Sequence, residues 1–172
     1  TTWFKTGKPD LSVSLNGVLA GLVAITASCA YVTPAASIII GLIAGPLFVF
    51  SASWLEALKI DDPVGAVPVH LVNGIWGTLA VGLFATIPGN TGTTGLLAGG
   101  GFDLLLAQIV GVVGVGLWSA VTCGIMFYVL KRTVGLRVTP GEEIEGLDFG
   151  EHGAVAYPDL LPSAEAPVAA VP

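Results

Sequence analysis

The most constraining feature of this sequence is the absence of any charged side chain across residues 11–55. As a single helix this stretch would be about 67 Å long, roughly twice the hydrocarbon thickness of a bilayer. It must therefore fold back on itself, and Pro34 marks the place. Proline lacks an N–H group and pushes the preceding residue out of the helical region. We predict membrane-spanning helices at residues 11–30 and 35–57.

Two further uncharged stretches follow, at residues 63–102 and 104–130. The later part of the first is rich in Gly, Thr and Asn, which is loop composition, so one span remains at about 66–87. The second is long enough for a tilted helix at about 103–131. The sequence thus predicts an all-α integral membrane fold with four transmembrane helices in residues 1–134.

Composition and charge placement agree with a membrane location. Only 10% of the residues are charged and 53% are hydrophobic, whereas a soluble domain carries about a quarter charged residues. The basic residues all lie on one side of the predicted spans: Lys5, Lys8, Lys59, Lys131, Arg132 and Arg137. By the positive-inside rule that side is the cytoplasm. We expect a multi-pass protein of the cell membrane with a cytoplasmic C-terminus.

The C-terminal part differs in composition from the predicted spans. Residues 135–159 mix acidic, glycine and apolar residues, and we interpret them as a cytoplasmic regulatory region that docks on its own bundle. Residues 160–172 are rich in Ala, Pro and Val and are typical of a disordered tail. The net charge of -6 comes largely from this end, so nucleic acid is not expected as a partner.

His70 is the ionisable residue that does not suit lipid, since it lies inside a predicted span. Eight residues from Asp62 place it about 12 Å inward, near the middle of a core about 30 Å thick. Such residues are functional candidates, and a histidine can donate, accept and exchange a proton near neutrality. The alternative is a neutral histidine that only bonds a neighbouring helix. No second ligand accompanies it, so neither a metal nor another cofactor is expected.

Three segments, in order, resemble hallmark motifs of the ammonium transporter (Amt/Mep/Rh) family. They are GKPDLSVSLNGVLAGLVAITA at residues 7–27, IDDPVGAVPVHLVNGIWGT at 60–78, and the VGLRV, EEIEGLD and HG motifs within 134–157. The resemblance implies a homotrimer of eleven-helix subunits, each with a narrow hydrophobic pore for ammonium or methylammonium. This chain would supply the end of the seventh helix, the eighth to eleventh helices and the cytoplasmic C-terminal region.

The resemblance also implies roles for single residues. His70 matches the second of two pore histidines, and Thr26 matches a threonine near the cytoplasmic part of the conduction path. Leu71 and Asn73 depart from the pattern, standing where the family often has glycine and cysteine. A PII-type signal protein is a possible partner on the cytoplasmic face. The residues matched to the regulatory tail are Gly135, Arg137, Glu145, Gly146, Asp148, His152, Gly153 and Tyr157.

We therefore predict transmembrane transport of ammonium or ammonia. An ammonium-sensing receptor derived from the same fold is the alternative. A membrane-bound enzyme or a structural subunit of another complex has no supporting motif, because no nucleophile, phosphate loop or metal cluster is recognisable. The chain begins without Met, on a segment that reads like the last turn of an earlier span, so we expect it to be a partial subunit.

Overall fold

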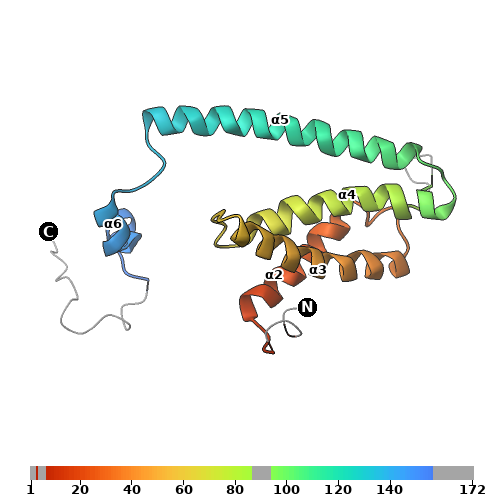
Figure 1. Cartoon of the computed structure of the whole chain (residues 1–172), viewed down its shortest axis with the longest axis horizontal. Helices are drawn as coiled ribbons and strands as arrows, with labels where there is room; N and C mark the ends of the chain where they lie inside the picture. Colours follow the sequence, from red (N-terminus) through yellow and green to blue (C-terminus); the bar gives the residue numbers. More distant parts are fainter. Residues whose placement is uncertain (1–2, 4–6, 87–93, 157–172) are drawn as a thin grey trace. The chain divides into compact units, whose positions relative to one another are not determined.

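The computed structural model describes residues 3, 7–86 and 94–156, and the chain divides into two compact units, Thr1–Trp118 and Ser119–Pro172. The described residues form helices and no strands, which confirms the all-α prediction (Figure 1). In chain order the elements are α2 (Leu11–Thr26), α3 (Pro34–Ala57), the π-helix η1 (Val67–Val72), α4 (Asn73–Phe84), the 3-10 helix η2 (Leu96–Ala98), α5 (Asp103–Thr133), α6 (Pro140–Glu145) and α7 (Leu147–His152).

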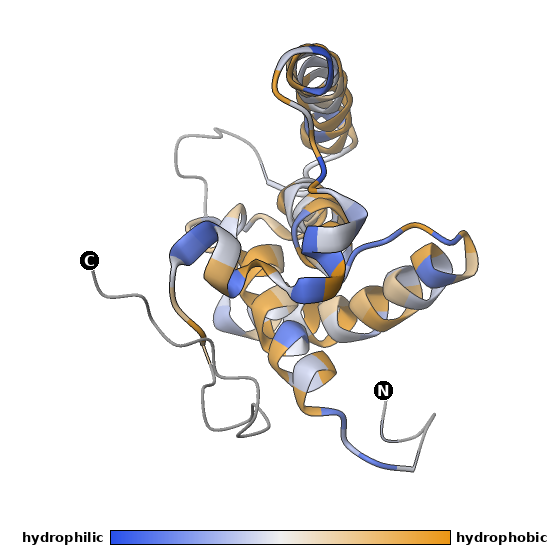
Figure 2. Ribbon diagram, turned by 90° about the vertical axis from the view of Figure 1, so that its left-hand side faces the viewer, coloured by the Kyte–Doolittle hydropathy of each residue, from blue (hydrophilic) through white to orange (hydrophobic). Residues whose placement is uncertain are grey.

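Apolar helices lie at all four positions where spans were predicted. Three of them, α3, η1 with α4, and α5, are long and apolar enough to cross a membrane, with mean hydropathies of 2.1, 1.5 and 2.1. The first, α2, is equally apolar in character but has only 16 residues. Figure 2 shows these helices coloured mainly as hydrophobic.

The first helix is shorter than predicted, since α2 ends at Thr26 and not at residue 30. The chain then continues in hydrogen-bonded turns, in which the Tyr31 N–H donates to the Ser28 carbonyl at 2.9 Å. The Tyr31 carbonyl in turn accepts the Thr86 N–H at 2.9 Å. This link to the chain just after α4 gives the backbone a partner outside the helix, which composition alone could not reveal.

The helix α3 begins at the proline where the fold-back was predicted. Pro34 is the first residue of α3, where its missing N–H costs nothing, and the Thr33 side chain accepts the Ala36 N–H at 3.3 Å as an N-cap.

The core of the first unit lies between α2, α3 and α4. Three of its five buried apolar residues are alanines, which let the helix backbones approach closely: Ala24, Val32, Ile40, Ala44 and Ala80. At Gly77 of α4 a Cβ atom would run into the backbone of Ala24 on α2. The Trp76 indole N–H donates to the Ile40 carbonyl at 3.1 Å and ties α4 to α3.

The second unit contains the two short helices α6 and α7. A capping box starts α6, in which Thr139 and Glu142 bond each other's backbone N–H groups. Gly146 separates the helices with φ 88 and ψ 155, a backbone region open essentially to glycine alone. The start of α6 and the break between α6 and α7 thus follow from a local cap and a glycine.

Candidate functional site

The segment that carries His70 begins with a capped loop. The Asp62 carboxylate accepts the N–H groups of Ala66 and Val67, both at 2.8 Å. These are orphan donors at the start of a helical segment, where a negative charge is also favoured by the helix dipole. Asp62 was expected only to mark the membrane interface, and its role as a cap follows from the structure.

The loop at residues 62–66, called the dipping loop below, also lies between the neighbouring helices α2 and α3. Gly65, at φ +72, lies so close to α2 and α3 that an added Cβ would meet the Phe48 ring at 3.2 Å and the Asn16 amide at 3.3 Å. The Asn16 side chain donates to the Val64 carbonyl at 3.2 Å. A bulkier residue at position 65 would push the loop out, so glycine is required here.

His70 follows in the π-helix η1, next to the buried Val69. Val69 packs with Ala20 and Phe48, which lie about 15 Å along α2 from Asp10 and about 14 Å along α3 from its last residue. The expected depth of about 12 Å assumed a continuous helix from Asp62. The helical segment in fact starts later, but the dipping loop carries His70 to the level of the middle of both neighbours.

The His70 side chain is exposed and lines a cavity of about 240 Å³. The remaining lining residues come from α2, the dipping loop and η1: Asn16, Leu19, Val64, Gly65, Ala66 and Val69. None of the residues that the structure describes hydrogen-bonds the imidazole. Among the described residues the ring therefore does not join two helices.

Asn73 closes the turn that holds His70. Its side-chain amide donates to the Pro68 carbonyl at 2.9 Å, and its backbone N–H donates to the His70 carbonyl. The residue is fully buried, and its carbonyl oxygen Oδ1 has no hydrogen-bond partner among the described residues. From the sequence, Asn73 was a departure from the family pattern that could add a polar group near the pore or bond a neighbouring helix; its amide instead bonds a carbonyl in its own turn.

Thr26 is not brought to this cavity. It is the last residue of α2, about 15 Å of helix rise beyond Asn16, and its hydroxyl donates to the Leu22 carbonyl at 2.7 Å. If the Asp10 end of α2 faces the cytoplasm, as the basic residues predict, Thr26 lies at the opposite end. The expectations of a cytoplasmic α2 start and a cytoplasmic Thr26 therefore exclude each other.

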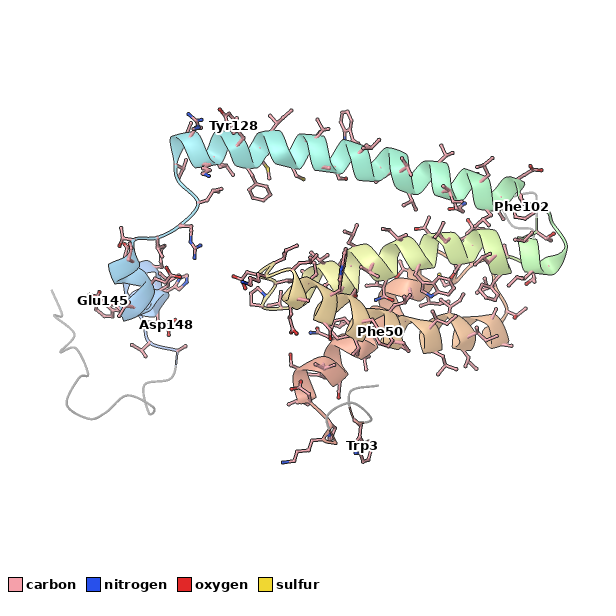
Figure 3. The ribbon with its side chains drawn as sticks, in the orientation of Figure 1. Trp3, Phe50, Phe102, Tyr128, Glu145 and Asp148 are labelled. Carbon is pink, nitrogen blue, oxygen red and sulfur yellow. The ribbon has the colours of Figure 1, made fainter. Side chains whose placement is uncertain are left out.

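The predicted tail residues lie in the second unit, and Tyr157 falls outside the described residues. Gly135, Gly146 and Gly153 all have positive φ, and His152 ends α7. Figure 3 shows Glu145 and Asp148, from α6 and α7 respectively.

Three carboxylates make hydrogen bonds or an ion pair in this unit. One oxygen of Asp148 accepts the Ala156 N–H at 2.9 Å. Arg137 pairs with Glu143 at 3.3 Å on an exposed surface, where such a pair adds little stability. Thr139 donates to Glu142 from its hydroxyl and its backbone N–H, and these bonds hold the pKa of Glu142 below its ordinary value.

The fold and the site together define a multi-pass membrane protein that holds a histidine beside a cavity among its apolar helices. The model of the Ammonium Transporter Family matches residues 1–157. The chain belongs to this family, which is a family of transporters.

Relatives support the assignment. The chain is 44% identical over 168 residues to ammonium transporter Amt2 of Archaeoglobus fulgidus, a match that covers 93% of this chain and 35% of that protein. It is 42% identical over 163 residues to ammonium transporter 3 of Dictyostelium discoideum, covering 88% and 36% respectively. The chain thus spans about a third of the length of these relatives.

Solved structures share the fold. A protein described as a sensor Amt protein is 39% identical with a TM-score of 0.75, covering 87% of this chain and 36% of its own. Mep2 of Candida albicans is 28% identical with a TM-score of 0.70, covering 82% and 32% respectively.

Proposed function

We propose that the complete protein carrying this chain conducts ammonium, as ammonia with or without its proton, across the cell membrane. Membership of the ammonium transporter family, over residues 1–157, is the observation that carries this proposal. The protein would be a homotrimer of eleven-helix subunits with a cytoplasmic C-terminus.

In this proposal His70 lines the conduction path. Its exposure beside a cavity and its lack of a partner within the described residues leave the ring free to bond a solute or a group from another part of the subunit. Thr26 is a weaker candidate for the conduction path than His70, because it lies at the end of α2 that is far from the cavity.

The test is methylammonium uptake by the complete protein in liposomes, with His70→Ala and Leu71→Ala compared to wild type. We expect saturable uptake by wild type and a strong change in rate or ion selectivity for His70→Ala, with trimer assembly retained. Leu71 is 55% exposed in the same turn, so Leu71→Ala controls for truncation there. Unchanged uptake by His70→Ala would refute the assigned role.

A second function, ammonium sensing, is favoured by one comparison. The sensor Amt protein resembles this chain with a TM-score of 0.75 at 39% identity. The same uptake experiment separates the two functions: a sensor would bind methylammonium at the folded trimer without accumulating it inside the liposomes.

Residues 135–159 would form a regulatory region, with a PII-type protein as a candidate partner on the cytoplasmic face. The apolar residues of this region are largely exposed in their own unit, including Ile144 at 86% and Phe149 at 57%. Such exposure suits a docking role. Glycine backbone geometry would hold these anchors in place.

Gly146→Ala tests this regulatory role. At φ 88 the new side chain strains the backbone although nothing lies within 4 Å of it. We expect reduced uptake with an intact pore, measured as a lower maximal rate at unchanged selectivity. Gly150→Ala is the matched control, because Gly150 has open space and no positive φ. Equal uptake by both variants would argue against coupling between tail and pore.

A further inference from the structure

Asn73 carries the buried side-chain polar atom that lacks a hydrogen-bond partner among the described residues. We propose that Asn73 is a positioning residue for His70: its side chain stabilises the π-helical turn that carries the imidazole. The inference rests on the proposed conduction role of His70, and its test is built so that the two can fail separately.

Asn73 donates hydrogen bonds to two backbone carbonyls of the turn that carries His70. Its side-chain amide reaches the Pro68 carbonyl at 2.9 Å, two residues before His70, and its backbone N–H reaches the carbonyl of His70 itself. One residue thus bonds two peptide groups of the turn: the Pro68–Val69 group, and the His70–Leu71 group that directly follows the Cα of His70. The ring direction depends on those groups, since no described residue holds the ring itself.

The Asn73 side chain gives the Pro68 carbonyl a hydrogen-bond donor. In a π-helix each carbonyl accepts the N–H five residues later, so the partner of the Pro68 carbonyl would be the Asn73 N–H. That N–H is directed to the His70 carbonyl instead. The Asn73 side-chain amide donates to the Pro68 carbonyl, and without it this buried carbonyl would lose this donor.

The unpaired oxygen argues that packing is not the reason for asparagine at this position. Asn73 is 0% exposed, and a buried carbonyl without a partner carries a desolvation cost. A leucine of similar size would fill the same space without that cost. The amide donor is the one contribution that an apolar residue cannot make.

The experiment compares wild type, Asn73→Leu, Asn73→Asp and Thr78→Val in the complete protein. Thr78→Val is the matched control, because it removes a side-chain bond to the Gly74 carbonyl (2.9 Å) in the same helix, outside the His70 turn. Three quantities are measured: thermal unfolding in detergent, the KM and maximal rate of methylammonium uptake, and the ring signals of His70 in histidine-labelled NMR spectra.

We expect Asn73→Leu to fold with an equal or higher unfolding temperature. Its maximal uptake rate should fall by about tenfold or more, because misplacing a reacting group by about an ångström has effects of this size. KM should change less than the rate, and the ring signals of His70 should shift. Thr78→Val should leave the rate and the ring signals as in wild type.

Wild-type uptake and wild-type His70 signals in Asn73→Leu would overturn the proposal, and so would an equal effect of Thr78→Val. If Asn73→Leu does not fold, Asn73→Asp decides, since it keeps the size and an acceptor oxygen but replaces the donating NH₂ group. Should neither variant fold, Asn73 serves folding and the proposal is wrong. If wild type itself shows no uptake, the transport proposal fails while the His70 signals still test the positioning role.

Discussion

Glu142 in the tail shows how a single residue can control a local structure. Its carboxylate accepts the backbone N–H of Thr139 at 2.8 Å and the Thr139 hydroxyl at 2.7 Å. Both bonds favour the ionised carboxylate, so the pKa of Glu142 lies below its ordinary value. The first turn of α6 depends on this reciprocal cap.

The sign of the pH dependence follows from the lowered pKa. The capping contribution is complete above the pKa of an unfolded glutamate, and it is lost as the pH falls through the lower folded value. We expect the α6 amide signals to lose protection at acidic pH in NMR spectra of the complete protein. In Thr139→Ala the carboxyl signal of Glu142 should titrate at a higher pH. A Glu142 titration that is unchanged in Thr139→Ala would contradict this account.

Single residues differ in how far the sequence predicts them. His70 could be found because an ionisable group in an apolar segment is rare. The hydrogen bonds of Asn16 and Asn73 could not be predicted, because an uncharged amide in an apolar stretch does not reveal its partner. Thr26 was assigned by resemblance, and its place at the end of α2 disagrees with the predicted orientation.

At the scale of the elements, α2 and α4 are joined by the close approach at Gly77. A Cβ atom there would collide with the backbone of Ala24, which is itself fully buried. Backbone atoms cannot move aside as a flexible side chain can. The contact therefore fixes how closely the two helices pack.

Gly77→Ala should lower the stability of the bundle. Overpacking typically costs about 1–3 kcal/mol, which exceeds the roughly 1 kcal/mol that alanine gains over glycine within a helix. Gly74→Ala is the control, because its Cβ would meet Val23 only at 4.0 Å. Thermal unfolding of the complete protein should rank Gly74→Ala above wild type and Gly77→Ala below it. The reverse order would show that the helices can separate at no cost.

The helices themselves were largely predictable, and their details were not. Proline and the charged residues delimit α3 and α5 closely, because both act on the backbone or on solvation directly. The π-helix η1 was missed, since α- and π-helices share the same residue preferences to first order. Many glycines occur in these helices, and spacing alone did not show that Gly77 makes the close contact.

At the scale of the whole molecule, the first unit keeps much of its apolar surface uncovered. Leu15, Leu22, Leu42 and Phe50 are each more than half exposed, with values from 58% to 70%. Such surface suits lipid or further helices. The relatives are about three times as long as this chain, and helices of such a longer protein would cover part of this surface.

We expect residues 1–172 alone not to transport methylammonium. A conduction path needs walls on all sides, and here the His70 cavity is lined only by α2, η1 and the loop before it. The measurement is uptake into liposomes that hold either residues 1–172 or the complete protein at equal density. Saturable uptake by residues 1–172 would show that these helices form a path unaided.

The π-helix η1 has a consequence for how this region can change through evolution. A π-turn is one residue longer than the α-turn it replaces, so it behaves as an accommodated insertion. Deleting one residue from 67–72 would restore an α-helix and rotate everything after it by about 100° relative to everything before it. His70 could then no longer face its cavity while Gly77 faces Ala24. A relative that lacks one residue here would therefore direct its histidine away from this cavity. Such a gap in an alignment marks a change at the site as well as a change of length.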